Sequence, residues 1–397
     1  MKWRRAAGIG LIILGIGLVV WAGVRWGSWS EPLKSPLGKI AIGDERQPTR
    51  NDGAGKIVMG FLPYWNIKYE PTIQYGKLTH LAFFGLNVNA DGSIQKREKA
   101  GNLEPGWAAY QSAKMGEIVR KAHNNGAEVI LVLRAFDNQT IESILSSRDR
   151  QEKLIAEAFE AVKTKNLDGV NIDFEYVGSP PKVVRDQFSK LVEGFRYHCS
   201  LLIVSCSLSV DAYADAADND RIWDITSLGE IVDYIVIMGY DFTRPGSEYS
   251  GPVAPLDQIK EAIAAYSKTV PITKLILGVP YYGYEWPTLS REPISKTTDI
   301  GYLATYRRIR EMILGTDPAK LGTPQLGWDE ESFTPYLIST KSGKTTQVFY
   351  DDARSLGLKY DLVNESGMAG IAIWALGYEG EHPELWELIR KKFPLPF

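Results

Sequence analysis

Asn171, Asp173 and Glu175 occupy every second position of the segment DGVNIDFE, residues 168–175, with apolar residues between them. In a β-strand this alternation puts the three polar side chains on one face and the apolar ones on the other. Two carboxyl groups that share a poorly hydrated face raise each other's proton affinity, so one of them stays protonated near neutral pH. The segment therefore predicts general acid chemistry, provided that its polar face is buried.

The elements that must position this face alternate between strands and helices. Eight strands are predicted, at 56–65, 78–88, 127–135, 168–175, 202–210, 232–240, 274–282 and 368–376. Helical patterns fall between most of them, around 109–124, 149–165, 182–197, 255–267, 351–365 and 383–392. Strand-then-helix alternation indicates parallel strands joined by right-handed crossovers. The pattern favours an α/β fold of the TIM (β/α)8 barrel type over a doubly wound open sheet, because no GxGxxG follows the first strand.

In a barrel, the two faces of the alternating strand have different surroundings. The apolar residues of 168–175 then face the helices, and Asn171, Asp173 and Glu175 point inward, toward the carboxyl-terminal rim where barrel active sites lie. Burying these groups is costly unless they serve one another. The structural alternative is a solvated strand face or a hydrogen-bond cluster without catalysis.

One connection is longer than the others, between the seventh and eighth strands. Within it, 298–314 is predicted as a helix, and 327–340 with 345–352 as a hairpin that turns at 341–344. We expect a small α+β insertion at about 287–349, which would form one wall of a substrate cleft.

The amino terminus predicts a membrane anchor. Basic residues of MKWRR precede an uncharged run from Ala6 to Val24, which as a helix would span about 28 Å, close to the hydrocarbon thickness of a bilayer. Residues 1–27 are expected to form a cytoplasmic basic flank and signal anchor, and 28–55 a linker. The body, 56–397, would then lie outside a single-pass membrane segment, or be secreted if that segment is cleaved.

Composition excludes several classes of function. The formal net charge of −3 shows no basic surplus for nucleic acid. The four histidines are scattered, without metal-ligand spacing, so we expect no metal and no cofactor. Cys199 and Cys206 are seven residues apart; an extended run of that length spans about 23 Å, so both are predicted as buried free thiols.

Four motifs in order resemble glycoside hydrolase family 18, the chitinase family, over roughly residues 56–393. The strand-four run resembles its DGxDxDxE signature, and Met238, Tyr240 and Asp241 resemble its Met-x-Tyr-Asp element. The segment LGVPYYGYEW resembles GxPxYG, and GIAIWALG contains Trp374 where the family has the Trp that floors the sugar site.

Two departures point to one branch of the family. Asn171 replaces the first Asp of the triplet, and the strand-three SxGG pattern is replaced by residues 132–135. With VAPLDQI, YYGYEW and VFYDDARSL, these features look like the bacterial spore-germination and cortex-lytic peptidoglycan N-acetylglucosaminidases. That branch often carries LysM wall-binding modules, which the sequence lacks.

The resemblance implies an N-acetylhexosamine polysaccharide substrate and substrate-assisted, retaining catalysis. It implies Glu175 as general acid and base, Asp173 and Tyr240 as residues that orient the acetamide, and Asn171 as a hydrogen-bond partner of Asp173 that alters the pH profile. The substrate-binding residues implied or suggested are Asp241, Trp374, Met238, Tyr282, Trp286, Trp65 and Tyr64, with Met238 lining the barrel interior and the last four as cleft-wall aromatics that could equally be packing.

Alternatives remain open at the level of the sequence. The enzyme could be a chitinase or an endo-N-acetylglucosaminidase on glycoprotein glycans, and a catalytically inactive glycan-binding protein could share the fold. The sequence does not predict the oligomeric state.

Overall fold

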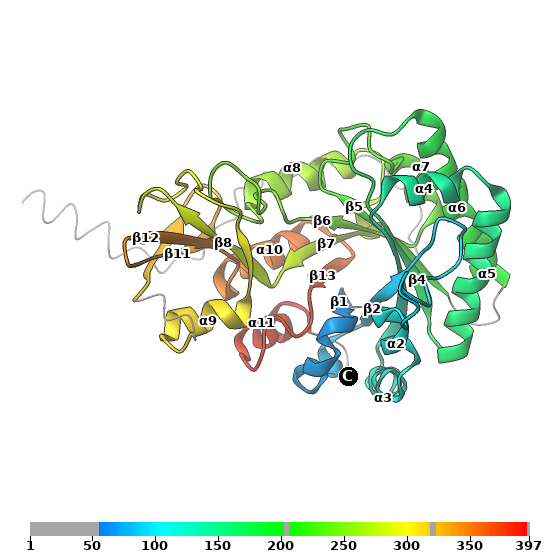
Figure 1. Cartoon of the computed structure of the whole chain (residues 1–397), viewed down its shortest axis with the longest axis horizontal. Coiled ribbons are helices and arrows are strands. Elements are labelled where there is room, and N and C mark those ends of the chain that lie inside the picture. The colour runs from blue at the N-terminus through cyan, green and yellow to red at the C-terminus, as the bar shows by residue number, and fades with distance from the viewer. Residues whose placement is uncertain (1–54, 202–205, 318–322, 395–397) are drawn as a thin grey trace, which may run out of the picture. The chain divides into compact units, whose positions relative to one another are not determined.

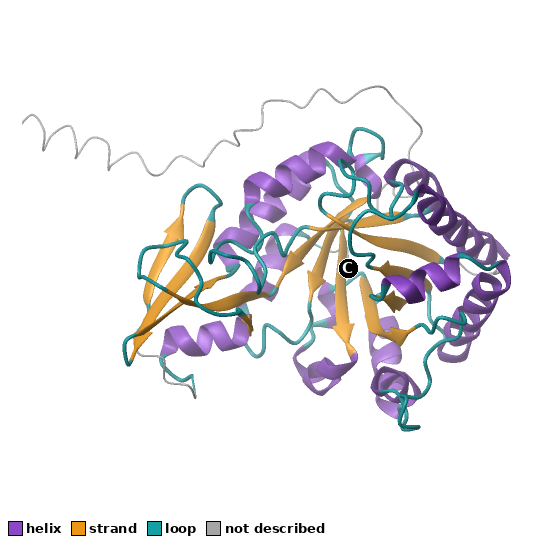
Figure 2. Ribbon diagram, turned by 45° about the horizontal axis from the view of Figure 1, so that its top comes forward, coloured by secondary structure: helices purple, strands orange, loops and turns teal. Residues whose placement is uncertain are grey.

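The computed structural model describes residues 55–201, 206–317 and 323–394. Eight parallel strands close into a barrel in the order β1-β13-β7-β6-β5-β4-β3-β2. They are β1 Ile57–Pro63, β2 His80–Asn87, β3 Glu128–Ala135, β4 Gly169–Phe174, β5 Ser207–Tyr213, β6 Tyr234–Met238, β7 Leu275–Pro280 and β13 Gly370–Trp374. Figure 2 shows the helices outside these strands. The predicted TIM barrel is therefore confirmed.

The helices that cover the barrel are amphipathic. They are α2 Pro105–Gln111, α3 Ala113–Asn124, α4 Asn138–Leu145, α5 Arg148–Lys165, α6 Lys182–Leu201, α7 Ile225–Ile231, α8 Leu256–Tyr266, α10 Ala353–Ser366 and α11 Glu384–Lys392. Local signals explain their ends: α10 begins with a capping box of Asp352 and Ser355 and ends at Gly367 in the left-handed conformation. The short helices α4 and α7 were not among the helices expected from sequence.

Strand β4 shows how the sequence sets the barrel. Its residues Val170, Ile172 and Phe174 are completely buried, and the Phe174 ring lies 6.0 Å from that of Phe188 on α6. They form the helix-facing side, as predicted. A Cβ on Gly169 would lie 2.1 Å from the carbonyl oxygen of Ser207, so glycine is required for β5 to approach.

Between β7 and β13 the chain forms a separate five-stranded sheet in the order β10-β11-β12-β8-β9. Its strands are β8 Tyr282–Thr288, β9 Tyr302–Thr305, β10 Gln325–Asp329, β11 Thr334–Lys341 and β12 Lys344–Phe349, with α9 Tyr306–Leu314 after β9. In Figure 1 this group lies to the left of the barrel strands. The predicted hairpin turn is confirmed, because Lys341 pairs with Lys344 across it.

Two details of the insertion differ from the prediction. The expected strand 327–340 is two antiparallel strands, β10 and β11, because the chain turns at Phe333, which has a φ of 56°. The expected helix 298–314 begins only at Tyr306, because residues 302–305 pair with β8 as strand β9.

The prediction that Cys199 and Cys206 are free thiols is wrong. They form a disulfide, with Cα atoms 5.3 Å apart. The error came from treating the segment between them as one extended run. Cys199 lies in the last turn of α6 and Cys206 just precedes β5, so the chain reverses direction between the two residues.

The predicted anchor and linker, 1–27 and 28–55, fall almost entirely outside the described residues and remain predictions. Within 55–201, 206–317 and 323–394, no helix combines the length and the hydrophobicity that crossing a bilayer requires.

Candidate active site

The polar face of β4 points into the barrel and not to solvent. Asn171 is completely buried and Asp173 is 3% exposed, whereas Glu175 is half-buried just beyond the end of the strand. The Glu175 amide donates to the carbonyl of Ala135 at 2.9 Å, which extends the pairing with β3 and fixes this position. The face therefore ends at the carboxyl-terminal rim of the barrel.

Asn171 does not make the expected hydrogen bond to Asp173. Its amide nitrogen donates to Ser209 Oγ at 2.9 Å and to Asp211 Oδ1 at 2.7 Å, both on β5. With both donors used, Asn171 Oδ1 and Asp173 Oδ1 are left buried without partners. Ser209 and Asp211 on the next strand take both N–H donors of the Asn171 amide. No donor therefore remains for Asp173, which lies on the same strand as Asn171.

Strand β5 supplies two groups that sequence reasoning missed. Asp211 is 4% exposed beside Asn171, and the hydroxyl of Tyr213 hydrogen-bonds Glu175. A signal was available, because Ser207, Ser209, Asp211 and Tyr213 alternate with apolar residues in the same way as β4.

The carboxyl groups of this cluster hold protons more tightly than usual. Burial, followed by the charges of Glu175 and Asp211, raises the pKa of Asp173 well above its usual range, although the charge of Arg134 lowers it. Burial raises the pKa of Glu175, although a hydrogen bond with Tyr213 lowers it, and burial raises the pKa of Asp211 to about 8. A carboxyl group that is protonated near neutral pH can act as a general acid.

Two further polar residues follow β6. Burial, reinforced by the surrounding carboxylates, raises the pKa of Tyr240, so its phenol remains a hydrogen-bond donor. Asp241 has a φ of 61° and accepts hydrogen bonds from the hydroxyls of Tyr282 at 2.5 Å and Tyr284 at 2.9 Å. Asp241 reaches solvent, yet the protein around its carboxyl group removes enough water to raise the pKa against these two bonds.

Aromatic rings line the rim next to these groups. Trp374 is half-buried at the end of β13, and its ring lies 4.6 Å from that of Phe84 on β2. Trp65, 40% exposed, meets Phe84 edge-on at 5.9 Å and Tyr64 at 4.9 Å. Phe136, which the sequence analysis did not select, is exposed and stacks on Phe84 at 6.3 Å. Such exposed rings can pack on the apolar faces of sugars.

Arg134 was noted in the sequence only as part of a departure from the family pattern. It is the register partner of Asp173, on the neighbouring strand β3. Its guanidinium carbon lies 4.9 Å from the ring centre of Phe84, 5.3 Å from that of Tyr64 and 5.9 Å from that of Trp65. The Arg134 guanidinium therefore lies next to the aromatic rings of the rim, on the strand beside the one that carries Asp173.

Three of the expected substrate-binding residues lie inside the protein. Met238 is 8% exposed in the barrel interior, as expected. Tyr282 is 2% exposed and points its hydroxyl at Asp241. The placement of Trp286 on the cleft wall is wrong, because it is completely buried in the insertion sheet and its ring packs at 5.6 Å from Tyr284.

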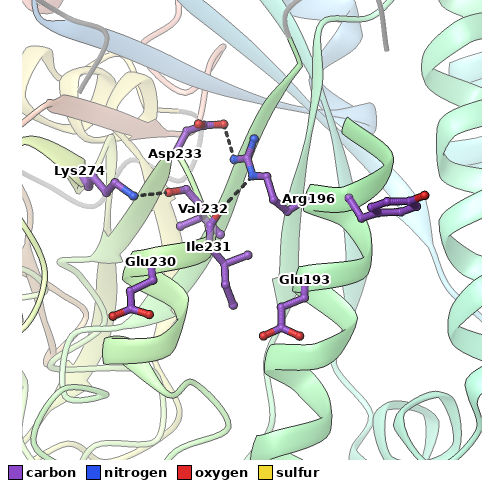
Figure 3. A pocket seen from close by; sticks show the side chains of 8 residues that line it. Glu193, Arg196, Glu230, Ile231, Val232, Asp233 and Lys274 are labelled. Atoms are coloured by element: carbon purple, nitrogen blue, oxygen red, sulfur yellow. Dashed lines mark hydrogen bonds and ion pairs between the residues drawn. The ribbon is translucent and has the colours of Figure 1, made fainter. Parts of the chain in front are cut away.

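A surface pocket of about 480 Å³ lies at the other end of the barrel, at the amino-terminal ends of β6 and β7. Figure 3 shows that two cationic side chains of the pocket, Arg196 and Lys274, are already bonded to other groups of the protein. Arg196 pairs with Asp233 at 2.6 Å, and Lys274 donates to the carbonyl of Val232 at 3.0 Å. This end of a barrel contributes to stability, so the pocket is not the candidate site.

A parallel barrel with protonatable carboxyl groups at the end of its fourth strand, beside an aromatic wall, defines a class of barrel glycosidases. The profile of glycosyl hydrolases family 18 matches residues 57–379. The chain belongs to this family and is a glycosidase.

Several relatives are bacterial proteins whose names refer to sporulation or to lysis of cortical fragments. Over 264 residues the chain is 29% identical to YdhD of Bacillus subtilis (strain 168), which carries the name of a sporulation-specific glycosylase; the match covers 66% of this chain and only 58% of YdhD. It is 24% identical over 334 residues to the cortical fragment-lytic enzyme of Bacillus anthracis, which covers 80% of this chain and 69% of that enzyme.

Solved structures share the fold at lower identity. The Bacillus cereus spore cortex-lytic enzyme SleL is 19% identical with a TM-score of 0.68, over 86% of this chain and 75% of that one. A family 18 chitinase from Cycas revoluta, in complex with (GlcNAc)3, is 16% identical with a TM-score of 0.71, over 84% of this chain and 98% of that one. These similarities support the fold alone.

Proposed function

We propose that the protein cleaves β-1,4 bonds after N-acetylglucosamine in peptidoglycan, with Glu175 as general acid and base. The observation that carries this proposal is the pair Asp173 and Glu175 on the inner face of β4. Both carboxyl groups have raised pKa values, and Glu175 is the one at the open rim, where a glycosidic oxygen could reach it.

The reaction proceeds without a protein nucleophile, an exception to the usual two-carboxylate scheme. Glu175 gives its proton to the glycosidic oxygen as the bond to the anomeric carbon breaks. The carbonyl oxygen of the substrate's own acetamide attacks that carbon, and an oxazolinium ion forms. The Glu175 carboxylate then takes a proton from water, which attacks the same carbon as the bond from that carbon to the acetamide oxygen breaks. The acetamide is restored, and the product retains the configuration.

The neighbouring residues hold the acetamide in place. Asp173 accepts the acetamide N–H and stabilises the positive charge that develops, and the Tyr240 phenol donates to the acetamide oxygen. Asp241 contacts the distorted sugar, and Trp374 forms the floor of the sugar site.

The substrate and the location rest on separate support. Relatives named as cortical fragment-lytic enzymes favour bacterial wall glycan as the substrate. The disulfide between Cys199 and Cys206 favours an oxidising, extracytoplasmic compartment. Residues 1–27 would anchor the barrel to the cell membrane.

Chitin is the second candidate substrate. The human di-N-acetylchitobiase is 25% identical over 303 residues, covering 70% of this chain and 76% of that enzyme. A site that reads only N-acetylglucosamine would accept chitin and peptidoglycan alike.

Digestion of purified peptidoglycan and colloidal chitin, side by side, with analysis of the reducing ends, tests the proposal. We expect GlcNAc reducing ends from peptidoglycan, at least tenfold faster than from chitin. Glu175→Gln should lower kcat at least about 100-fold and leave substrate binding intact. Glu193→Gln, on the exposed face of α6, is the control. Full activity of Glu175→Gln would refute its role, and a wild type that binds without turnover would indicate a glycan-binding protein.

A further inference from the structure

Arg134 is buried beside the aromatic rings of the rim with unused hydrogen-bonding capacity. Its side chain is 8% exposed, and its Nε is buried without a partner. Among the described residues its guanidinium forms neither a hydrogen bond nor an ion pair. A guanidinium has five N–H donors and its charge is costly to bury, so an arginine without acceptors calls for one from outside the chain.

The neighbours of Arg134 hold it without satisfying these donors. The rings of Tyr64, Trp65 and Phe84 stabilise a cation through their faces but offer no acceptor in the plane of the guanidinium. Asp173 is its register partner and feels its charge, but no direct ion pair closes between them, and Asp173 Oδ1 is itself unpartnered. Arg134 is therefore not half of an internal salt bridge.

The surrounding charge indicates what kind of ligand needs this arginine. The carboxyl-terminal end of the barrel contains the carboxyl groups of Asp173, Glu175, Asp211 and Asp241, which repel an anionic glycan whenever they are ionised. A neutral glycan needs no cation here. Peptidoglycan differs from chitin by a lactyl ether on alternate sugars, and the carboxyl group of that ether is a free anion wherever the stem peptide has been removed from it. The planar fork of a guanidinium matches a carboxylate with two parallel hydrogen bonds.

We propose that Arg134 is a specificity-determining residue that binds the lactyl carboxylate of a peptide-free N-acetylmuramic acid next to the N-acetylglucosamine being cleaved. This proposal rests on the proposed function and adds to it the chemical group by which peptidoglycan is told from chitin. Arg134 binds the substrate's anion and takes no part in the proton transfers.

The test uses three soluble substrates: an alternating GlcNAc–MurNAc oligosaccharide freed of stem peptides, the same oligosaccharide with its lactyl groups methyl-esterified, and a chitooligosaccharide of equal length. Arg134→Met removes the charge, and Arg134→Lys keeps the charge without the fork. Arg148→Met, on the exposed surface of α5, changes the net charge equally and should behave as the wild type.

We expect Arg134→Met to lower kcat/KM on the acidic oligosaccharide about tenfold to hundredfold, mainly through KM, with less than about threefold change on the ester and on the chitooligosaccharide. The kcat/KM of Arg134→Lys on the acidic oligosaccharide should lie between those of the wild type and Arg134→Met. The kcat/KM of the wild type should be lower on the ester than on the acidic oligosaccharide by the same factor, because esterification removes the anion without any mutation. Equal losses on all three substrates, or a wild type that ignores esterification, would overturn the proposal.

Binding separates this proposal from the proposed function. Titration of Glu175→Gln with the acidic and the esterified oligosaccharide measures recognition without turnover. A preference for the acid that Arg134→Met abolishes supports the role of Arg134 even if the wild type hydrolyses neither substrate. Equal affinity for acid and ester refutes it even if the wild type is active on peptidoglycan.

Discussion

Asn171 on β4 donates a 2.7 Å hydrogen bond to Asp211 on β5 inside the barrel. The strand-four sequence has an amide where a third acid would complete the DxDxE pattern. The neighbouring strand provides that acid, in contact with the amide. Three carboxyl groups are therefore present in the cluster, but one of them, that of Asp211, lies on β5 and not on β4.

Asp211→Asn should change the pH profile of hydrolysis. The negative charge of Asp211 raises the pKa of Asp173, so its removal favours the ionised form of Asp173 and lowers that pKa. We expect the profile of kcat/KM between about pH 4 and 9 to shift toward acid. A profile that superimposes on that of the wild type would contradict this role.

Exchanging the two residues provides a stricter test. Asn171→Asp alone places two acids within hydrogen-bond distance in a buried site, and should lose activity. The double variant Asn171→Asp/Asp211→Asn restores one acid and one amide at the same contact. We expect it to recover at least tenfold over Asn171→Asp in kcat/KM. No recovery would show that the strand on which the acid lies is decisive.

The stability of the protein should fall as the pH rises. The pKa of Asp211 is raised to about 8 in the folded protein, above the value of about 4 in an unfolded chain. Between these values the folded state binds the extra proton, so the stabilisation is greatest below about pH 4 and is lost by about pH 8. Thermal unfolding should show Asp211→Asn more stable than the wild type at pH 8 and not at pH 4. Equal differences in Tm at both pH values would argue against this linkage.

The two tyrosines on β8 should set the acid limit of activity through Asp241. Their hydroxyls donate to Asp241 and lower its pKa, so Tyr282→Phe and Tyr284→Phe should raise it. The acid limb of the pH profile should then move to higher pH, and the double variant should move it furthest. Tyr302→Phe, exposed on β9, is the control. Loss of activity at all pH values without a shift would indicate a packing defect.

Gly169→Ala should destabilise the barrel where β4 begins. The added Cβ would lie 2.1 Å from the Ser207 carbonyl oxygen, so we expect a loss of more than about 2 kcal/mol in the free energy of unfolding. Gly116→Ala, inside α3 with no atom within 4 Å of the new Cβ, should stabilise by about 0.5–1 kcal/mol. Urea unfolding of both variants measures the contrast. Similar effects of the two substitutions would contradict the close approach of β4 and β5.

The sequence predicts the barrel well because its strands are buried apolar runs separated by amphipathic helices. The inward face of β4 follows from alternation alone, since the period of two leaves no other side for Asn171 and Asp173. Asp211 lies on an equally clear alternation in β5, and attention to that strand would have found it.

Other parts depend on contacts between distant segments. Arg134 meets Tyr64 and Phe84 only through the closure of β1, β2 and β3, which local spacing does not encode. Trp286 has the composition of a cleft-wall residue, and the sheet that buries it forms from segments up to residue 349. These placements are set by tertiary packing, so single-sequence patterns could not give them.

The disulfide links a helix of the outer layer to a barrel strand that contributes side chains to the candidate active site. Cys199 ends a surface helix, and Cys206 precedes the strand whose inner face carries Ser209, Asp211 and Tyr213. A reducing agent would therefore remove the covalent link between α6 and β5, the strand that carries Asp211 and Tyr213, and leave the side chains of the site chemically unchanged.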